Sequence, residues 1–100
     1  GMSFGQNLYL LGMLNEIAFL KTQKAQYIND AEKYFTEARN LGPKRPQALY
    51  GLLDVYRIKG DVSNAKIIGE QILNQWPADA KVKGILQSLV EGASSGTKAK

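Results

Sequence analysis

Cysteine and histidine are both absent from this chain of 100 residues. Without cysteine there is no disulfide framework, no thiolate nucleophile and no cysteine-ligated zinc or iron–sulfur site. Without histidine there is no Ser-His-Asp triad, no HExxH zinc helix and no imidazole base near neutral pH. The sequence also lacks a phosphate-binding glycine loop and an Asp-rich metal loop. We therefore expect no catalysis, no metal site and no cofactor.

No run of uncharged apolar residues reaches the roughly 18–20 that cross a membrane. The nearest stretch, residues 8–20, is interrupted by Asn15 and Glu16, so we expect no membrane span in this chain. A signal peptide is not expected either, because no basic segment and no small-residue cleavage site are present. Gly1 and Met2 resemble the scar of an expression tag, as in a piece cut from a longer protein. The cytoplasm is favoured as the compartment, with the periplasm open if the chain belongs to a larger protein.

The excess of positive charge is small. Thirteen Lys and Arg against nine Asp and Glu give a net charge of +4, and Lys98 and Lys100 at the end of the chain supply two of those charges. The remaining basic residues are scattered rather than clustered along one face. Because a nucleic-acid footprint needs a basic stripe or patch, we expect no nucleic-acid partner. A weak nucleic-acid-binding helical domain stays the alternative from this class.

Apolar residues recur at three- and four-residue steps, and nowhere alternate as in a strand. The pattern predicts an all-α protein of five helices at about 6–24, 27–41, 46–59, 62–75 and 79–90. Pro46 suits the first turn of the third helix, and Asp61 and Asp79 are N-cap candidates for the last two. Residues 92–100 carry no large apolar residue to bury and are expected to be disordered, as are residues 1–5.

The chain is similar to itself at a fixed offset. Pro43 and Pro77 lie 34 residues apart, and so do Ala31 and Ala65. Thirty-four residues is the period of a helix–turn–helix solenoid unit. We therefore expect one domain over 6–91, built from a first hairpin at 6–45, a second hairpin at 46–78 and a capping helix at 79–91. An unrelated five-helix bundle with chance spacing is the alternative.

The second unit resembles the tetratricopeptide repeat (TPR) family. The residues on the family's signature positions are Leu49, Leu52, Leu53, Tyr56, Gly60, Ala65, Ile72 and Pro77. Leu49 departs from the usual tryptophan, and Gly69 stands where an aromatic residue is usual, although Phe35 keeps it in the first unit. The resemblance covers about residues 12–90. It implies a right-handed α-α superhelix that binds protein without catalysis, as a scaffold.

The resemblance also implies that the first helix of each unit lines a concave peptide groove. The candidate groove residues are Glu16, Leu20, Gln47, Tyr50, Asp54, Arg57 and Lys81. Some family members clamp a peptide's terminal carboxylate, but Glu16 and Asp54 would repel one. We therefore expect a basic or mixed-charge peptide rather than a carboxylate clamp. An ordinary solvated helix face is the alternative for these residues.

The first helix is apolar on more than one side, whereas a surface helix needs one apolar stripe. Its candidate interface residues are Leu8, Leu10, Leu11, Met13 and Leu14. Three explanations stay open: the helix dimerises with a second copy, it docks a preceding repeat or neighbouring domain, or it is partly frayed. A further hypothesis is that the chain is the soluble tail of a larger bacterial protein, such as a membrane-embedded glycan polymerase or ligase.

Overall fold

The structure, a computed structural model, describes residues 3–42 and 45–98, with side chains as far as residue 92. Its regular secondary structure is entirely helical over these residues, which confirms the all-α prediction. The helices are α1 (Phe4–Thr22), α2 (Ala25–Leu41), α3 (Pro46–Lys59), α4 (Val62–Gln75) and α5 (Ala80–Lys98). Pro43, on which part of the predicted repeat rests, lies outside the described residues.

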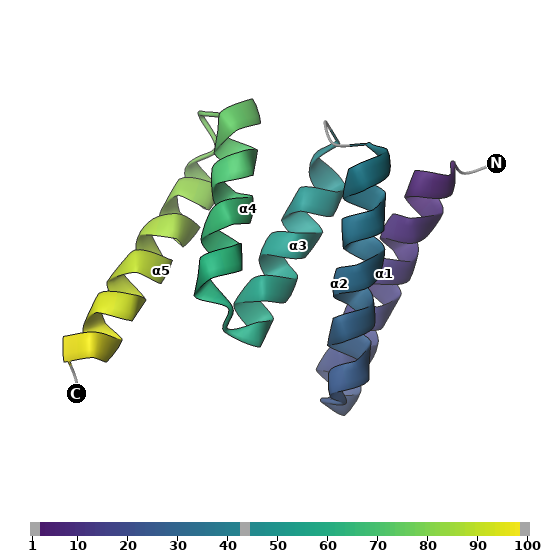
Figure 1. The fold of residues 1–100 in the computed structure, drawn as a ribbon, viewed down its shortest axis with the longest axis horizontal. Coiled ribbons are helices and arrows are strands. Elements are labelled where there is room, and N and C mark those ends of the chain that lie inside the picture. Colours follow the sequence, from purple (N-terminus) through teal and green to yellow (C-terminus); the bar gives the residue numbers. More distant parts are fainter. Residues whose placement is uncertain (1–2, 43–44, 99–100) are drawn as a thin grey trace.

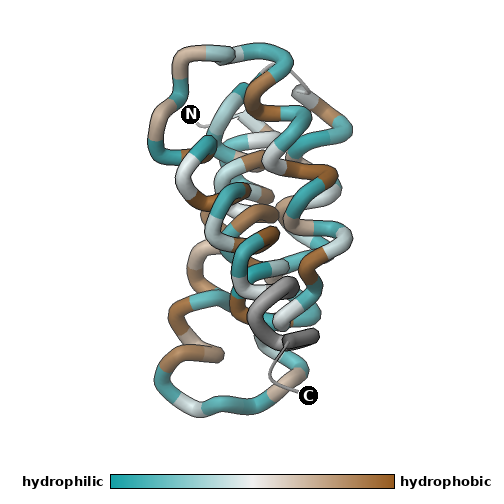
Figure 2. Tube along the Cα trace, turned by 90° about the vertical axis from the view of Figure 1, so that its left-hand side faces the viewer, coloured by the Kyte–Doolittle hydropathy of each residue, from teal (hydrophilic) through white to brown (hydrophobic). Residues whose placement is uncertain are grey.

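The helices stand in a row, each antiparallel to the one before it (Figure 1). Each packs against its neighbours in sequence, and α1 also touches α3. The row runs from α1 at one end to α5 at the other, along the longest dimension of 50 Å. Hydrophobic and hydrophilic segments alternate along the chain (Figure 2), as expected where one side of a helix is packed and the other faces solvent.

Local signals fix the bounds of α3 and α4, and these bounds confirm the prediction. Pro46 occupies the first turn of α3, and Gly60 ends it in a left-handed conformation with φ of 72°. The Asp61 carboxylate accepts from the Asn64 N–H at 3.1 Å and caps α4. Asp79 likewise accepts from the Val82 N–H at 3.0 Å, which confirms it as a capping residue for α5.

The structure describes helix within both ends for which the sequence predicts disorder, at residues 4–5 and 92–98. Ser3 and Gln6 form a capping box, in which each side chain accepts from the other residue's backbone N–H, so α1 begins at Phe4. At the other end α5 continues to Lys98. No proline interrupts the segment after Val90, so the backbone carries the helix onward although large apolar residues are lacking.

The core is centred on Phe35 of α2, which is 1 % exposed. Its ring lies between two glycines, one on each neighbouring helix. A Cβ atom on Gly12 of α1 would come within 2.6 Å of the ring, and one on Gly51 of α3 within 2.7 Å. Both glycines are needed because only a residue without a side chain lets α1 and α3 close on this ring. The Tyr9 ring packs beside it, with a centroid distance of 5.8 Å.

The second hairpin reverses this arrangement. Gly69 of α4 stands 34 residues after Phe35 and is buried, and the side chain that meets it is Leu86 of α5. A Cβ atom on Gly69 would lie 2.6 Å from Leu86. The bulk that α2 supplies in the first hairpin is therefore supplied by the last helix in the second. Position 69 therefore has no room for a bulky side chain such as the one that Phe35 supplies in the first hairpin.

A polar contact ties α2 to α3 at the edge of the core. The Glu32 carboxylate accepts from the Tyr56 hydroxyl at 2.9 Å and from the Lys59 ammonium at 2.6 Å. Burial, with the hydrogen bond to Glu32 as the next cause, raises the pKa of Tyr56 to about 12. The hydroxyl therefore stays protonated and remains a donor over the whole physiological range.

Replacing Gly12 by alanine tests the Phe35 contact. Gly12→Ala forces a Cβ atom into the ring, whereas Gly84→Ala on α5 places one in open space. Both changes gain the same helix propensity, so the difference between the two variants isolates the overpacking. We expect Gly12→Ala to be less stable than Gly84→Ala by about 1–3 kcal/mol in chemical denaturation. Equal stability of the two variants would mean that the ring does not hold the helices at this distance.

Candidate functional site

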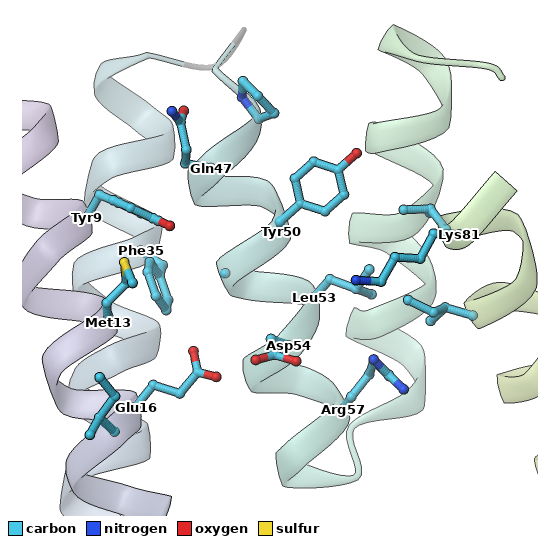
Figure 3. A pocket seen from close by; sticks show the side chains of 15 residues that line it. Tyr9, Met13, Glu16, Phe35, Gln47, Tyr50, Leu53, Asp54, Arg57 and Lys81 are labelled. Carbon is cyan, nitrogen blue, oxygen red and sulfur yellow. The ribbon is translucent and has the colours of Figure 1, made fainter. Parts of the chain in front are cut away.

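Helices α1, α3 and α5 line an open groove of about 510 Å³ (Figure 3), with α3 between the other two. Six of the seven candidate groove residues line it: Glu16, Gln47, Tyr50, Asp54, Arg57 and Lys81. Leu20 does not, because it lies one helical turn beyond Glu16. The groove also contains residues that sequence reasoning did not assign to it, among them Tyr9 and Ile85. Tyr9 shares a face of α1 with Met13 and Glu16 at helical spacing, a signal that was available in the sequence.

Two carboxyl groups meet in the middle of the groove. The Glu16 side chain extends from α1 toward Asp54 on α3 (Figure 3). Burial raises the pKa of Glu16 to about 8, with the hydrogen bond and the charge of Asp54 adding to the effect. At neutral pH the Glu16 carboxyl group is therefore mostly protonated. Glu16 therefore adds little negative charge to the groove at neutral pH.

The opposite side of the groove is basic. Arg57 and Lys81 are both exposed, and Figure 3 shows Arg57 pointing away from Asp54 and Lys81 reaching in from α5. The ion pair that the described residues form within 4 Å joins Glu32 and Lys59, and neither of these residues lines the groove. The groove is therefore polarised, with acid between α1 and α3 and base between α3 and α5.

Tyr50 is held in place by α5. Its hydroxyl donates to the Asp79 carboxylate, the group that also caps α5. The Tyr50 hydrogen bond lowers the pKa of Asp79, with the Val82 N–H as the second cause, and the same bond raises the pKa of Tyr50. Sequence reasoning placed Tyr50 in the groove but gave no sign of this contact, which joins residues 29 positions apart. The ring is therefore fixed before any ligand arrives.

The apolar candidates on α1 separate into two groups. The expectation that Leu8 is exposed is wrong: it is 5 % exposed and packs with Ala38 and Ala48 in a second small cluster. The reason is that Leu8 lies one turn before Gly12, on the face that meets α2 and α3. The exposed group comprises Leu10, Leu11, Met13 and Leu14.

Neither a metal centre nor a membrane span is present in the part of the chain that the structure describes. No group of three or more Asp or Glu residues there could hold a metal ion, and no helix among residues 3–42 and 45–98 combines the length and apolarity of a bilayer crossing. The sequence matches no protein-family model, and no curated protein is significantly similar to it.

The protonation of Glu16 predicts how stability depends on pH. The folded chain holds this proton more tightly than the unfolded chain, so the free energy of unfolding is highest below the ordinary pKa of 4.5 and falls as pH rises through about 8. In Glu16→Gln the side-chain amide does not titrate and can donate to Asp54 at every pH, so this variant should not lose stability as the pH rises.

The measurement is urea denaturation at pH 5 and pH 9. Because Glu16 is only partly buried, solvent screening reduces the expected benefit of Glu16→Gln at pH 9 to the order of 1 kcal/mol. Glu70→Gln, on the exposed side of α4, is the control and should follow the wild type. If the stability of the wild type rises between pH 5 and pH 9, and that of Glu16→Gln rises equally, the raised pKa of Glu16 is contradicted.

Proposed function

We propose that this chain is a non-catalytic, TPR-like protein-binding module that takes an extended segment of a partner in the groove of α1, α3 and α5. The observation that carries the proposal is the convergence of Glu16, Tyr50, Asp54, Arg57 and Lys81, from three helices, on one open hollow. A concave surface with a fixed aromatic ring and several polar groups suits peptide capture.

The order of the helices supports the repeat interpretation. In such an array the first helices of successive units lie side by side, and α1 touches α3 here although α2 separates them in sequence. The groove is lined by these two helices and by the capping helix α5. The offset of 34 residues between Phe35 and Gly69, both buried at a helix contact, fits two related hairpins.

The charges of the groove define the chemistry of the ligand. Asp54 with Glu16 would attract a Lys or Arg side chain, and such a cation would also favour loss of the Glu16 proton. Arg57 and Lys81 would attract an acidic side chain on the α5 side. The ligand is therefore a peptide with a basic residue followed or preceded by an acidic one. A terminal carboxylate clamp is disfavoured, since Asp54 stands in the middle of the floor.

The exposed apolar side of α1 is a second surface through which such a module would associate with protein. It lies next to the groove, since Met13 and Ile17 border both. A partner on this surface would leave the polarised centre of the groove open, because Glu16 and Tyr9 point the other way toward α3.

Binding of fluorescein-labelled peptides with alternating Arg and Glu residues tests the groove. We expect Asp54→Asn and Arg57→Ala each to weaken binding about tenfold, the loss of one charged contact. Tyr50→Phe should weaken it less, because the ring remains. The measurement is fluorescence polarisation at low salt, with circular dichroism to confirm that each variant is folded.

Lys66→Ala, on the exposed side of α4, is the matched control and should bind like the wild type. If the wild type and the three groove variants bind the peptides equally, or if binding is lost equally in the control, the groove is not the site. Binding that depends only on peptide net charge and not on Asp54 or Arg57 would also exclude the groove.

A further inference from the structure

The outer side of α1 carries a line of exposed apolar residues. Leu14 is 62 % exposed, Leu20 56 % and Ile17 46 %, and Leu10 and Met13 are each 37 % exposed. Helix α1 stands at one end of the row, and no described helix lies beyond it (Figure 1). Between Leu10 and Leu20 the only charged residue is Glu16, which faces the groove instead.

The spacing of this line is that of a coiled-coil seam. Leu10, Met13, Ile17 and Leu20 follow one another at steps of three, four and three residues, as the a and d positions of a heptad do. Leu14 flanks the seam at its middle. The side-chain amide of Asn15 needs no hydrogen-bond acceptor from a partner, because it donates to the Leu11 carbonyl of its own helix at 2.8 Å.

The other end of the row is different. The exposed side chains of α5 outside the groove, as far as residue 92, are mostly polar: Ala80, Lys83, Gln87, Ser88, Val90 and Glu91. Terminal repeats of a stacked array need such a polar outer face, and α1 does not have one. Stacking α1 of one copy on α5 of the next would bury these charges against leucines, so an open head-to-tail chain is disfavoured.

We propose that the occupant of this face is α1 of a second copy, packed antiparallel about a twofold axis. The seam is symmetric about Asn15, with Leu10 and Leu20 five residues to either side and Met13 and Ile17 two residues to either side. In an antiparallel pair Leu10 therefore meets Leu20 of the second copy, and Met13 meets its Ile17. All four layers of the seam are then apolar on both sides.

The size of the face sets the strength of this pair. The exposed apolar area is of the order of a few hundred Å² per copy, about the size of the largest apolar patch on a typical monomeric protein. It is below the about 800 Å² per partner of a standard stable complex. We therefore expect a weak and reversible dimer. It specifies the partner of the α1 surface proposed above, and it borders the groove because Met13 and Ile17 line both.

Sedimentation equilibrium of the full chain between about 1 and 200 µM tests the pair. The wild type should pass from monomer to dimer in this range. Leu14→Lys places two ammonium groups near the twofold axis and should raise the dissociation constant at least tenfold. Leu14 does not line the groove, so peptide binding should be unchanged. Ile67→Lys, at a residue 50 % exposed on α4, is the matched control and should dimerise like the wild type.

A wild type that stays monomeric at about 200 µM would overturn the proposal and leave the face to a preceding segment or another protein. Equal masses for Leu14→Lys and Ile67→Lys at every concentration would overturn it too. Loss of peptide binding in the groove variants leaves these masses unaffected, so failure of the dimer and failure of the groove can be told apart.

Oxidative cross-linking tests the direction of the pair, since the chain has no cysteine of its own. A mixture of Leu10→Cys and Leu20→Cys chains, treated with an oxidant, should form the mixed disulfide in preference to either homodisulfide. The Leu10→Cys chain alone should cross-link poorly. Preferential formation of the Leu10→Cys homodisulfide would show a parallel pair and contradict the twofold packing.

Discussion

The packing of Phe35 between Gly12 and Gly51 is the contact on which the rest of the structure depends. The ring joins α2 to both α1 and α3, and the two glycines determine how closely those helices approach it. The separation of α1 and α3 is also the width of the acidic side of the groove, where Glu16 reaches Asp54. A core contact therefore controls the geometry of the surface that we propose for binding.

The same contact leaves α1 with two different sides. One side, which includes Leu8 and Gly12, is buried in the core. The other side stays apolar and uncovered, and it meets the groove along Met13 and Ile17. The two ends of the row therefore differ: the exposed face of α1 is apolar, the exposed face of α5 is polar, and the groove lies between them.

Local chemistry made much of the fold predictable from the sequence. Proline, aspartate and glycine at the ends of α3 and α4 fixed both helices to the residue. The burial of Leu8 was not predictable, because α1 is apolar on most sides and its pattern does not say which side faces inward. The hydrogen bond from Tyr50 to Asp79 and the raised pKa of Glu16 beside Asp54 were not predictable from the sequence either. Both depend on helices that come together only in the folded chain.

The central claim, that the groove of α1, α3 and α5 binds a mixed-charge segment, is tested most directly by mapping amide chemical shifts of the labelled protein during titration with an Arg–Glu peptide. The account predicts that the largest shifts lie at residues such as Glu16, Tyr50, Asp54 and Lys81, which the groove brings together from three helices. Shifts confined to α2 and α4, or to the outer side of α1, would contradict it.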